Sequence, residues 1–227
     1  MRVLLLLAAA LLFWAGGPRQ ARAMAFEFPA NHCAAGQYQP APAHAGGSGM
    51  LLGTSAWAET GVCLKFPIQR LREAARDIDV MTWPGTTRII AVHDLAPQGS
   101  DQLLRRRVDY EANHSHLFAC HRAEWPMEWR ERVAPGADAR AGAIDISADR
   151  LPGGNSDGAY ITHWSARAEL VPVSATETSL HMRYEITAPG QDAKWAVGAI
   201  QGYIARLTAV AAGGKAPGAV LDPDCRG

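Results

Sequence analysis

The stretch that decides the fold is TSLHMRYEITAPGQDAKWAVGAIQGYIARLTAVAA, residues 178–212. Over 178–187 every second residue is apolar, which is typical of a strand with one buried and one solvated face. Over 192–212 the apolar residues recur at helical spacing, Asp192 can cap the start, and a glycine pair follows the end. Such a helix is roughly 30 Å long. The stretch therefore predicts a strand followed by a helix that lies across a whole sheet.

The residues before this stretch predict the other strands of the sheet. Over 160–170 the apolar Trp164, Ala166, Ala168 and Leu170 alternate with polar residues, which indicates a second half-buried strand. The other predicted elements are a strand over 60–66, a helix over 67–77, a hairpin over 87–95 and 101–110, and weaker strands over 116–121, 127–133 and 142–148. Antiparallel strands with one long amphipathic helix predict an α+β fold, in which a curved antiparallel sheet wraps around the C-terminal helix.

Several of these segments resemble the START-like, or SRPBCC, superfamily of helix-grip proteins, which includes polyketide cyclase and dehydrase-like proteins. The matching segments are 67–71, 77–85, the hairpin that begins at 88–92, and the ending from Tyr160 through Pro189 into the helix at 195–207. The resemblance covers about residues 58–212. It implies a cavity between the curved sheet and the long helix that holds an apolar molecule. Some members of the superfamily catalyse reactions there, and many only bind or carry.

The N-terminus has the pattern of a cleavable signal peptide. Arg2 precedes an apolar run of 12 residues over 3–14, and Ala21-Arg22-Ala23 has the small-x-small form that signal peptidase cleaves. We therefore expect a signal peptide over 1–23, a periplasmic or secreted protein, and no transmembrane anchor in the mature chain. Downstream we expect an irregular arm over 24–57, the START-like domain over 58–213 and a C-terminal tail over 214–227.

Charge and cysteines restrict the partners and the chemistry. Removing the three signal arginines from 22 leaves 19 basic against 22 acidic residues, so the sequence predicts no nucleic-acid partner. Cys33, Cys63, Cys120 and Cys225 predict two disulfides in an oxidising compartment. Three pairings are open, and we favour a bond from each tail to the domain. No C-x-x-C motif is present, so we expect neither a zinc site nor a thioredoxin-type redox site.

One arginine and a set of aromatic residues are candidates for ligand binding. Arg106 is in phase with Leu104, Val108 and Tyr110 on its predicted strand, so it points inward or stands at the mouth of a cavity. A buried arginine needs a partner, which is either a ligand carboxylate or an internal acid such as Glu131. The predicted ligand-binding residues are Arg106, Tyr110, Trp129, Trp164, Tyr184 and Tyr203, and Trp125 is a further inward aromatic. Ordinary core packing is the alternative for the aromatic residues.

Two further motifs concern a possible catalytic serine and a possible metal site. Residues 154–158 match G-x-S-x-G, but a turn precedes them and a strand follows, so we interpret them as a hairpin loop and not as a nucleophile elbow. His114, His116 and His121 are weak candidates for a metal site, because residues two apart on a strand share a face. We expect no metal and no obligatory cofactor.

The leading hypothesis is an exported START-like domain that binds an apolar or amphipathic, lipid-like small molecule. One alternative is a cyclase-, dehydrase- or hydrolase-type enzyme on the same scaffold. Another is an envelope interaction protein whose core is filled. A cavity of at least about 300 Å³ would favour binding, and converging histidines, arginines or acids inside it would favour catalysis.

Overall fold

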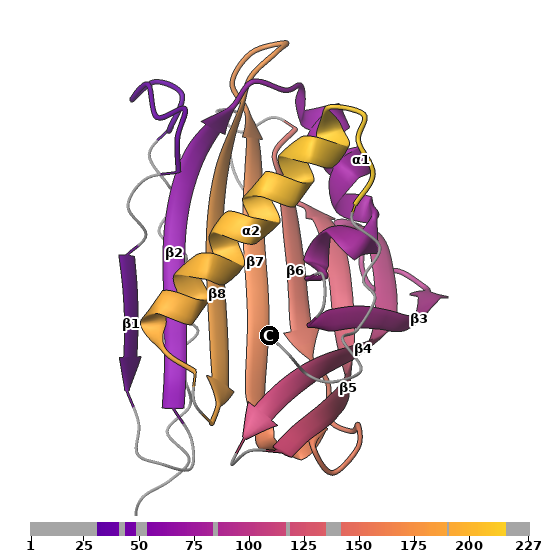
Figure 1. The fold of residues 1–227 in the computed structure, drawn as a ribbon. Coiled ribbons are helices and arrows are strands. Elements are labelled where there is room, and N and C mark those ends of the chain that lie inside the picture. Colours follow the sequence, from indigo (N-terminus) through magenta and orange to yellow (C-terminus); the bar gives the residue numbers. More distant parts are fainter. Residues whose placement is uncertain are drawn as a thin grey trace, which may run out of the picture.

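An eight-stranded antiparallel sheet and a long C-terminal helix make up most of the fold (Figure 1). The computed structural model describes residues 31–40, 44–48, 54–83, 86–116, 119–134, 142–189 and 191–216. The strand order is β1-β2-β8-β7-β6-β5-β4-β3. The strands are β1 (His44–Ser48), β2 (Thr54–Leu64), β3 (Thr87–Leu95), β4 (Gln102–His116), β5 (Ala119–Val133), β6 (Ile144–Arg150), β7 (His163–Pro172) and β8 (Thr178–Ala188). The helices are α1 (Ile68–Arg76), α2 (Ala193–Ala211) and the short 3₁₀ helices η1 (Ile78–Met81) and η3 (Gly158–Tyr160).

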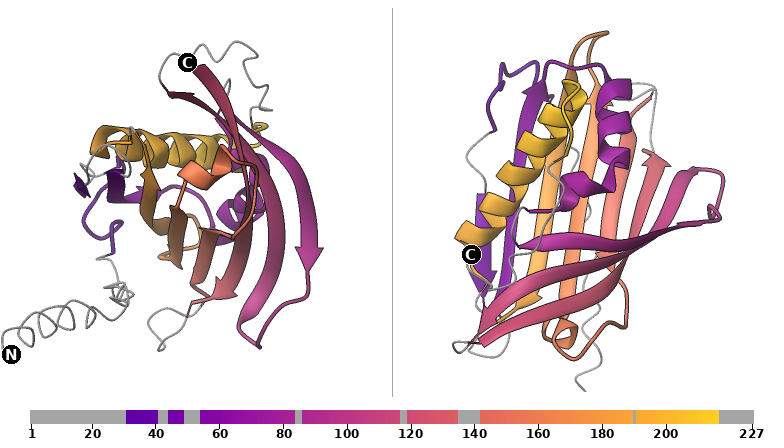
Figure 2. Two further views of the ribbon diagram at one scale, coloured as in Figure 1. Left: turned by 90° about the horizontal axis from the view of Figure 1, so that it is seen from below. Right: turned by 45° about the vertical axis from the view of Figure 1, so that its right-hand side comes forward.

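The sheet curves strongly, and both long helices lie on its concave side (Figure 2). Helix α2 crosses β2 and β8, while α1 packs beside α2. This arrangement confirms the predicted α+β fold with a curved sheet around the C-terminal helix. Within the described residues, no helix is long and apolar enough to span a membrane.

The concave face carries the core that the alternation predicted. Leu180, Met182, Tyr184 and Ile186 of β8 are buried, and so are the stripe residues of α2, of which Leu207 is among the most enclosed. Asp192 caps α2, because its side chain accepts a hydrogen bond from the backbone N–H of Trp195 at 2.7 Å. The period-two and period-3.6 patterns thus identified the two surfaces that pack together.

The N-terminal segment departs from the expected irregular arm over 24–57. Among its described residues, β1 is a complete strand, and β2 begins at Thr54, six residues before the predicted start at 60. Ala56 and Ala58 are buried and alternate with less buried residues, which is the period of a half-buried strand. Small residues weakened the apolar contrast of this alternation, although the strand pairs with β8 along its whole length. Residues 1–23 and 217–227, and hence the signal peptide and most of the tail, lie outside the described residues.

A short segment covers part of the convex face, which the alternation had predicted to be solvated. This N-terminal strap, residues 31–38, lies over β2 and β8, where Ser179 and His181 are buried on that face. The backbone N–H of His32 donates to Ser179 Oγ at 3.2 Å, and the backbone N–H of Cys63 donates to the Gln37 carbonyl at 2.6 Å.

A disulfide bond between Cys33 and Cys63 ties the strap to β2. The expected bond from the N-terminal arm to the domain is thereby confirmed. The side chain of Cys120 and all of Cys225 lie outside the described residues, so a second disulfide stays a prediction.

Candidate ligand-binding cavity

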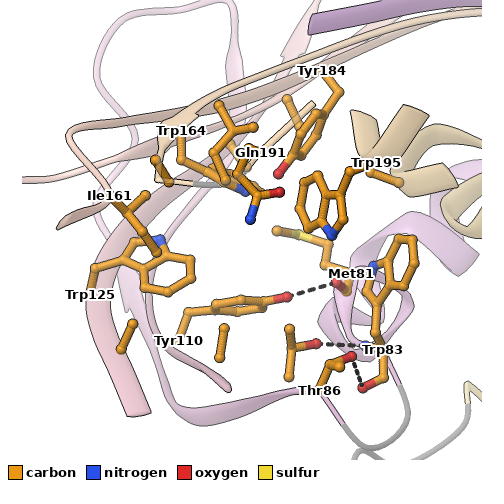
Figure 3. Close-up of a pocket in the computed structure, with 18 of the residues that line it drawn as sticks. Met81, Trp83, Thr86, Tyr110, Trp125, Ile161, Trp164, Tyr184, Gln191 and Trp195 are labelled. Carbon is orange, nitrogen blue, oxygen red and sulfur yellow. Dashed lines mark hydrogen bonds between the residues drawn. The ribbon is translucent and has the colours of Figure 1, made fainter. Parts of the chain in front are cut away.

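A cavity of about 180 Å³ lies between the concave face of the sheet and the N-terminal half of α2 (Figure 3). Strands β4 to β8 supply its floor and walls, and η1 with the residues after it closes one side. The residues that line it include Met81, Trp83, Tyr110, Trp125, Trp129, Ala148, Tyr160, Trp164, Ala166, Tyr184, Gln191, Trp195, Ala199 and Tyr203.

The register of the strands explains why space remains at this place. Trp129 of β5 pairs with Ala148 of β6, Ala148 with Ala166 of β7, and Ala166 with Tyr184 of β8. One row across the sheet therefore runs aromatic, alanine, alanine, aromatic. Three strand spacings separate the two aromatic residues, about 14 Å. The two alanine methyl groups between them are small, so space remains above the sheet at this position. Ala199 of α2 faces the cavity from the helix side.

Aromatic rings enclose this space. Tyr110 and Trp125 are paired across β4 and β5, with ring centroids 5.0 Å apart. The ring of Tyr184 lies edge-on to Trp164 at 5.8 Å and 5.6 Å from Trp195. These separations are in the range of favourable aromatic pairs, so the rings support one another as rigid walls.

The rim of the cavity is aromatic as well. Trp83 and Trp195 stack with ring centroids 6.2 Å apart. Trp195 is 41% exposed and Tyr160 is 59% exposed, whereas the inner aromatic residues are buried. The cavity therefore reaches the surface between large apolar side chains.

The three buried tyrosines at the cavity are neutral hydrogen-bond donors. Burial raises the pKa of Tyr110 and that of Tyr203 to about 12, and it raises the pKa of Tyr184 well above its ordinary value. The hydroxyl of Tyr110 donates to the Met81 carbonyl at 3.1 Å, and this bond joins β4 to η1. None of these hydroxyls is poised to lose its proton near neutral pH.

Charged groups are few at the cavity. Among the described lining residues they are Asp157, which is half-buried, and Arg167, which is exposed. The inner wall is formed by aromatic, aliphatic and uncharged polar side chains. This composition suits binding of an uncharged molecule.

Five of the six residues predicted to bind ligand line the cavity. They are Tyr110, Trp129, Trp164, Tyr184 and Tyr203, and Trp125 joins them. Sequence reasoning missed Trp83 and Trp195 at the rim. Trp195 was detectable, because it precedes Ala199 and Tyr203 at intervals of four residues and so shares their helical face.

Arg106 is the exception, and its predicted role in the cavity is wrong. The strand phase was right, but its guanidinium lies beside α1, where Nε donates to Asp94 at 2.9 Å and Nη1 donates to the Arg76 carbonyl at 2.8 Å. It also lies over the ring of Trp129, 5.8 Å from the centroid. These contacts engage Nε and Nη1 and hold the end of α1 against the sheet.

The internal acid suggested for Arg106 has other partners. Glu131 is fully buried, and it accepts hydrogen bonds from Arg72 at 2.5 Å and from Arg76 at 2.6 and 2.9 Å. Both arginines come from α1, which the sequence placed correctly but could not orient. The Glu131 cluster therefore anchors α1 to β5 and does not involve the cavity.

The other motifs have no place in the cavity chemistry. Residues 154–157 form a loop between β6 and β7 as predicted, although η3 and not a strand follows them directly. The Asn155 side chain accepts hydrogen bonds from the backbone N–H groups of Glu124 and Gly158. His114 and His121 are cross-strand neighbours near the end of the β4–β5 hairpin. The side chains of His114, His116 and His121 are outside the described part of the chain, so the metal hypothesis is untested.

No family model and no curated protein matches the sequence. Solved structures do match. A START superfamily protein from Mycobacterium smegmatis is 12% identical, with 69% of this chain and 97% of that chain covered and a TM-score of 0.41. Human STARD10 is 9% identical, covering 75% and 73%, with a TM-score of 0.46. An aromatase/cyclase from Streptomyces is 16% identical, covering 70% and 88%, with a TM-score of 0.35.

The likeness is one of fold. The topology described above is that of a helix-grip protein, and the predicted resemblance to the START-like superfamily is confirmed at that level. What each relative binds or converts is a property of that relative. The function of this chain has to be argued from its own cavity.

Proposed function

We propose that this protein binds a small, uncharged, largely apolar molecule of one or two rings in the cavity between the sheet and α2. The single observation that carries the proposal is an aromatic enclosure around an alanine floor, open at a rim formed by Trp83, Tyr160 and Trp195. The lack of converging charged groups among the described lining residues supports binding in preference to acid–base catalysis.

The size of the cavity restricts the size of the ligand. Its volume of about 180 Å³ does not reach the roughly 300 Å³ expected from the sequence analysis, which is the lower end of ordinary small-molecule pockets. Apolar cavities of about 150 Å³ take up a molecule the size of benzene. The volume therefore favours a compact ring compound over the lipid-like ligand expected from the sequence, because acyl chains would need several times this space.

Isopropylbenzene is a suitable probe, with calorimetry or the ligand-induced shift in Tm as the measurement. We expect saturable binding to the wild type. Ala199→Leu places a larger side chain in the cavity from α2 and should abolish binding, while the fold is retained or stabilised by the filled space. Ala209→Leu is the matched control, since Ala209 is exposed on the same helix and the same substitution there should leave binding unchanged.

The two variants decide between a binding protein and a filled core. Absence of isopropylbenzene binding to the wild type, or equal binding by wild type and Ala199→Leu, would contradict the proposed site. Circular dichroism of both variants shows whether the helix is intact and keeps the comparison valid.

We extend the proposal to the compartment: the mature protein acts in the periplasm or outside the cell. The apolar run at 3–14 and Ala21-Arg22-Ala23 support this, as does the Cys33–Cys63 disulfide, since such bonds persist in oxidising compartments. Expressed with its full N-terminus in a bacterial host, the exported chain should begin at Met24. A chain that keeps Met1 and stays in the cytoplasm would contradict export.

A further inference from the structure

We propose that the ligand carries an uncharged oxygen acceptor, such as a carbonyl or hydroxyl oxygen, and that Trp125 and Tyr184 donate hydrogen bonds to it. The inference rests on the proposed function and deepens it, because it names the polar group that the cavity would recognise.

Polar atoms without partners at the cavity wall carry the argument. Trp125 is 3% exposed and Tyr184 is 5% exposed, and within the described structure neither Nε1 of Trp125 nor the hydroxyl of Tyr184 donates a hydrogen bond, although the hydroxyl can accept one from the indole of Trp164. Oε1 of Gln191 is likewise shielded and unpartnered among the described residues. Burying such groups without partners is unfavourable. All three residues line the cavity, and Figure 3 shows the Tyr184 hydroxyl and the Gln191 amide directed into it.

The chemistry of these atoms sets the chemistry of the ligand. An indole N–H only donates, and the Tyr184 hydroxyl keeps its proton because burial raises its pKa. The ligand must therefore supply an acceptor oxygen. Gln191 can offer either its carbonyl oxygen or its amide N–H, so it accommodates a hydroxyl as well as a carbonyl.

Tyr110 is a tyrosine of the same cavity whose hydroxyl already donates a hydrogen bond within the protein. Its ring faces the same cavity, but its hydroxyl donates to the Met81 carbonyl and is not available to a ligand. By contrast, Nε1 of Trp125 and the hydroxyl of Tyr184 donate to no atom of the described structure. This contrast assigns recognition to Trp125 and Tyr184.

Among the described lining residues no buried cation faces an anionic ligand; Arg206 lies behind the rim, over the ring of Trp83. The described charged side chains at the cavity are Asp157 and Arg167, neither of which is buried, and burying a charge without a partner is costly. Access to the Tyr184 hydroxyl and to Nε1 of Trp125 requires side chains to move, because both atoms are shielded. Trp195 is the more exposed of the two rings beside Tyr184, so its rotation would open the path.

Three probes of nearly equal shape test the proposal. Acetophenone has an acceptor oxygen, isopropylbenzene has none, and benzoate is charged. Calorimetry with the disulfide-intact protein should detect acetophenone and isopropylbenzene and should detect no benzoate. Trp125→Phe and Tyr184→Phe should each weaken acetophenone about three- to tenfold, as expected for one hydrogen bond between neutral groups. Each substitution should change the affinity for isopropylbenzene less, so the ratio of the acetophenone affinity to the isopropylbenzene affinity should fall about three- to tenfold.

Tyr38→Phe is the matched control. Its hydroxyl donates to Glu177 on the outside of the protein, so its loss should leave both affinities unchanged. Equal effects of Trp125→Phe and Tyr184→Phe on acetophenone and isopropylbenzene, or no effect on either, would overturn the polar recognition while apolar binding stands. Failure of the wild type to bind either neutral probe would instead overturn the proposed function.

Discussion

We expect Gly61→Ala to destabilise the wild-type protein but to stabilise a protein that carries His32→Ala. Gly61 lies on the convex face of β2 under the N-terminal strap. A Cβ placed there would be 1.8 Å from Nε2 of His32, 2.0 Å from Cε1 and 2.4 Å from Cδ2. Such distances cannot be accommodated, so the His32 ring must leave its position.

The cost follows from what His32 loses. Its backbone N–H donates to Ser179 Oγ at 3.2 Å, its Nδ1 lies 2.6 Å from Gln37 Oε1, and its ring stacks on His181 with centroids 5.8 Å apart. If the strap backbone moves away with the ring, both hydrogen bonds are lost, and together they contribute about 1–3 kcal/mol. The disulfide at Cys33 keeps the strap tethered, so the loss stays local.

In a His32→Ala background the clash is absent, and alanine in a strand interior is favoured over glycine by about 0.5–1 kcal/mol. Gly61→Ala should therefore destabilise the wild type by about 1–3 kcal/mol and stabilise the His32→Ala protein slightly. Urea unfolding of the four proteins with the disulfide intact gives the coupling energy, expected at about 1.5–4 kcal/mol. An equal cost of Gly61→Ala in both backgrounds would refute the packing of His32 on β2.

Three further predictions concern stability. Glu131→Gln should lower the free energy of unfolding by about 3 kcal/mol, the lower end for breaking a buried ion pair, because Arg72 and Arg76 keep some access to water. Asp94→Asn is the control: Asp94 is 75% exposed in its ion pair with Arg106, so the loss in the same urea assay should be under about 1 kcal/mol. Leu207→Ala should cost about 2–5 kcal/mol, and a loss under about 0.5 kcal/mol would mean that the apolar face of α2 is misassigned. Burial lowers the pKa of His181, so the unfolded chain binds its proton more readily, and stability should fall as the pH drops below about 6.5; His181→Gln should flatten this decline, and an unchanged slope would exclude His181 as its source.

The sequence alone determined the elements in which large apolar residues recur at a regular spacing, because that spacing reveals which face is buried. Strand β8 and helix α2 were predictable because large apolar residues alternate at one period and then recur at another, and these periods follow from backbone geometry. The aromatic residues of the cavity were found for the same reason, since each lies in phase with a buried face. Strand β1 was missed, and β2 was placed too late, because alanine, glycine and serine give little contrast between faces.

Only the tertiary structure decided which side chains from different strands and helices meet, and where space remains between them. The cavity exists because Ala148 and Ala166 lie side by side between Trp129 and Tyr184, and that row depends on the register of four strands. Arg106 was correctly phased, yet its partners come from β3 and α1. Periodicity along one strand shows which face a side chain takes, but position along the sheet and contacts across it depend on strand register and helix placement. These are set by packing of the whole chain, so they could not be deduced from local sequence.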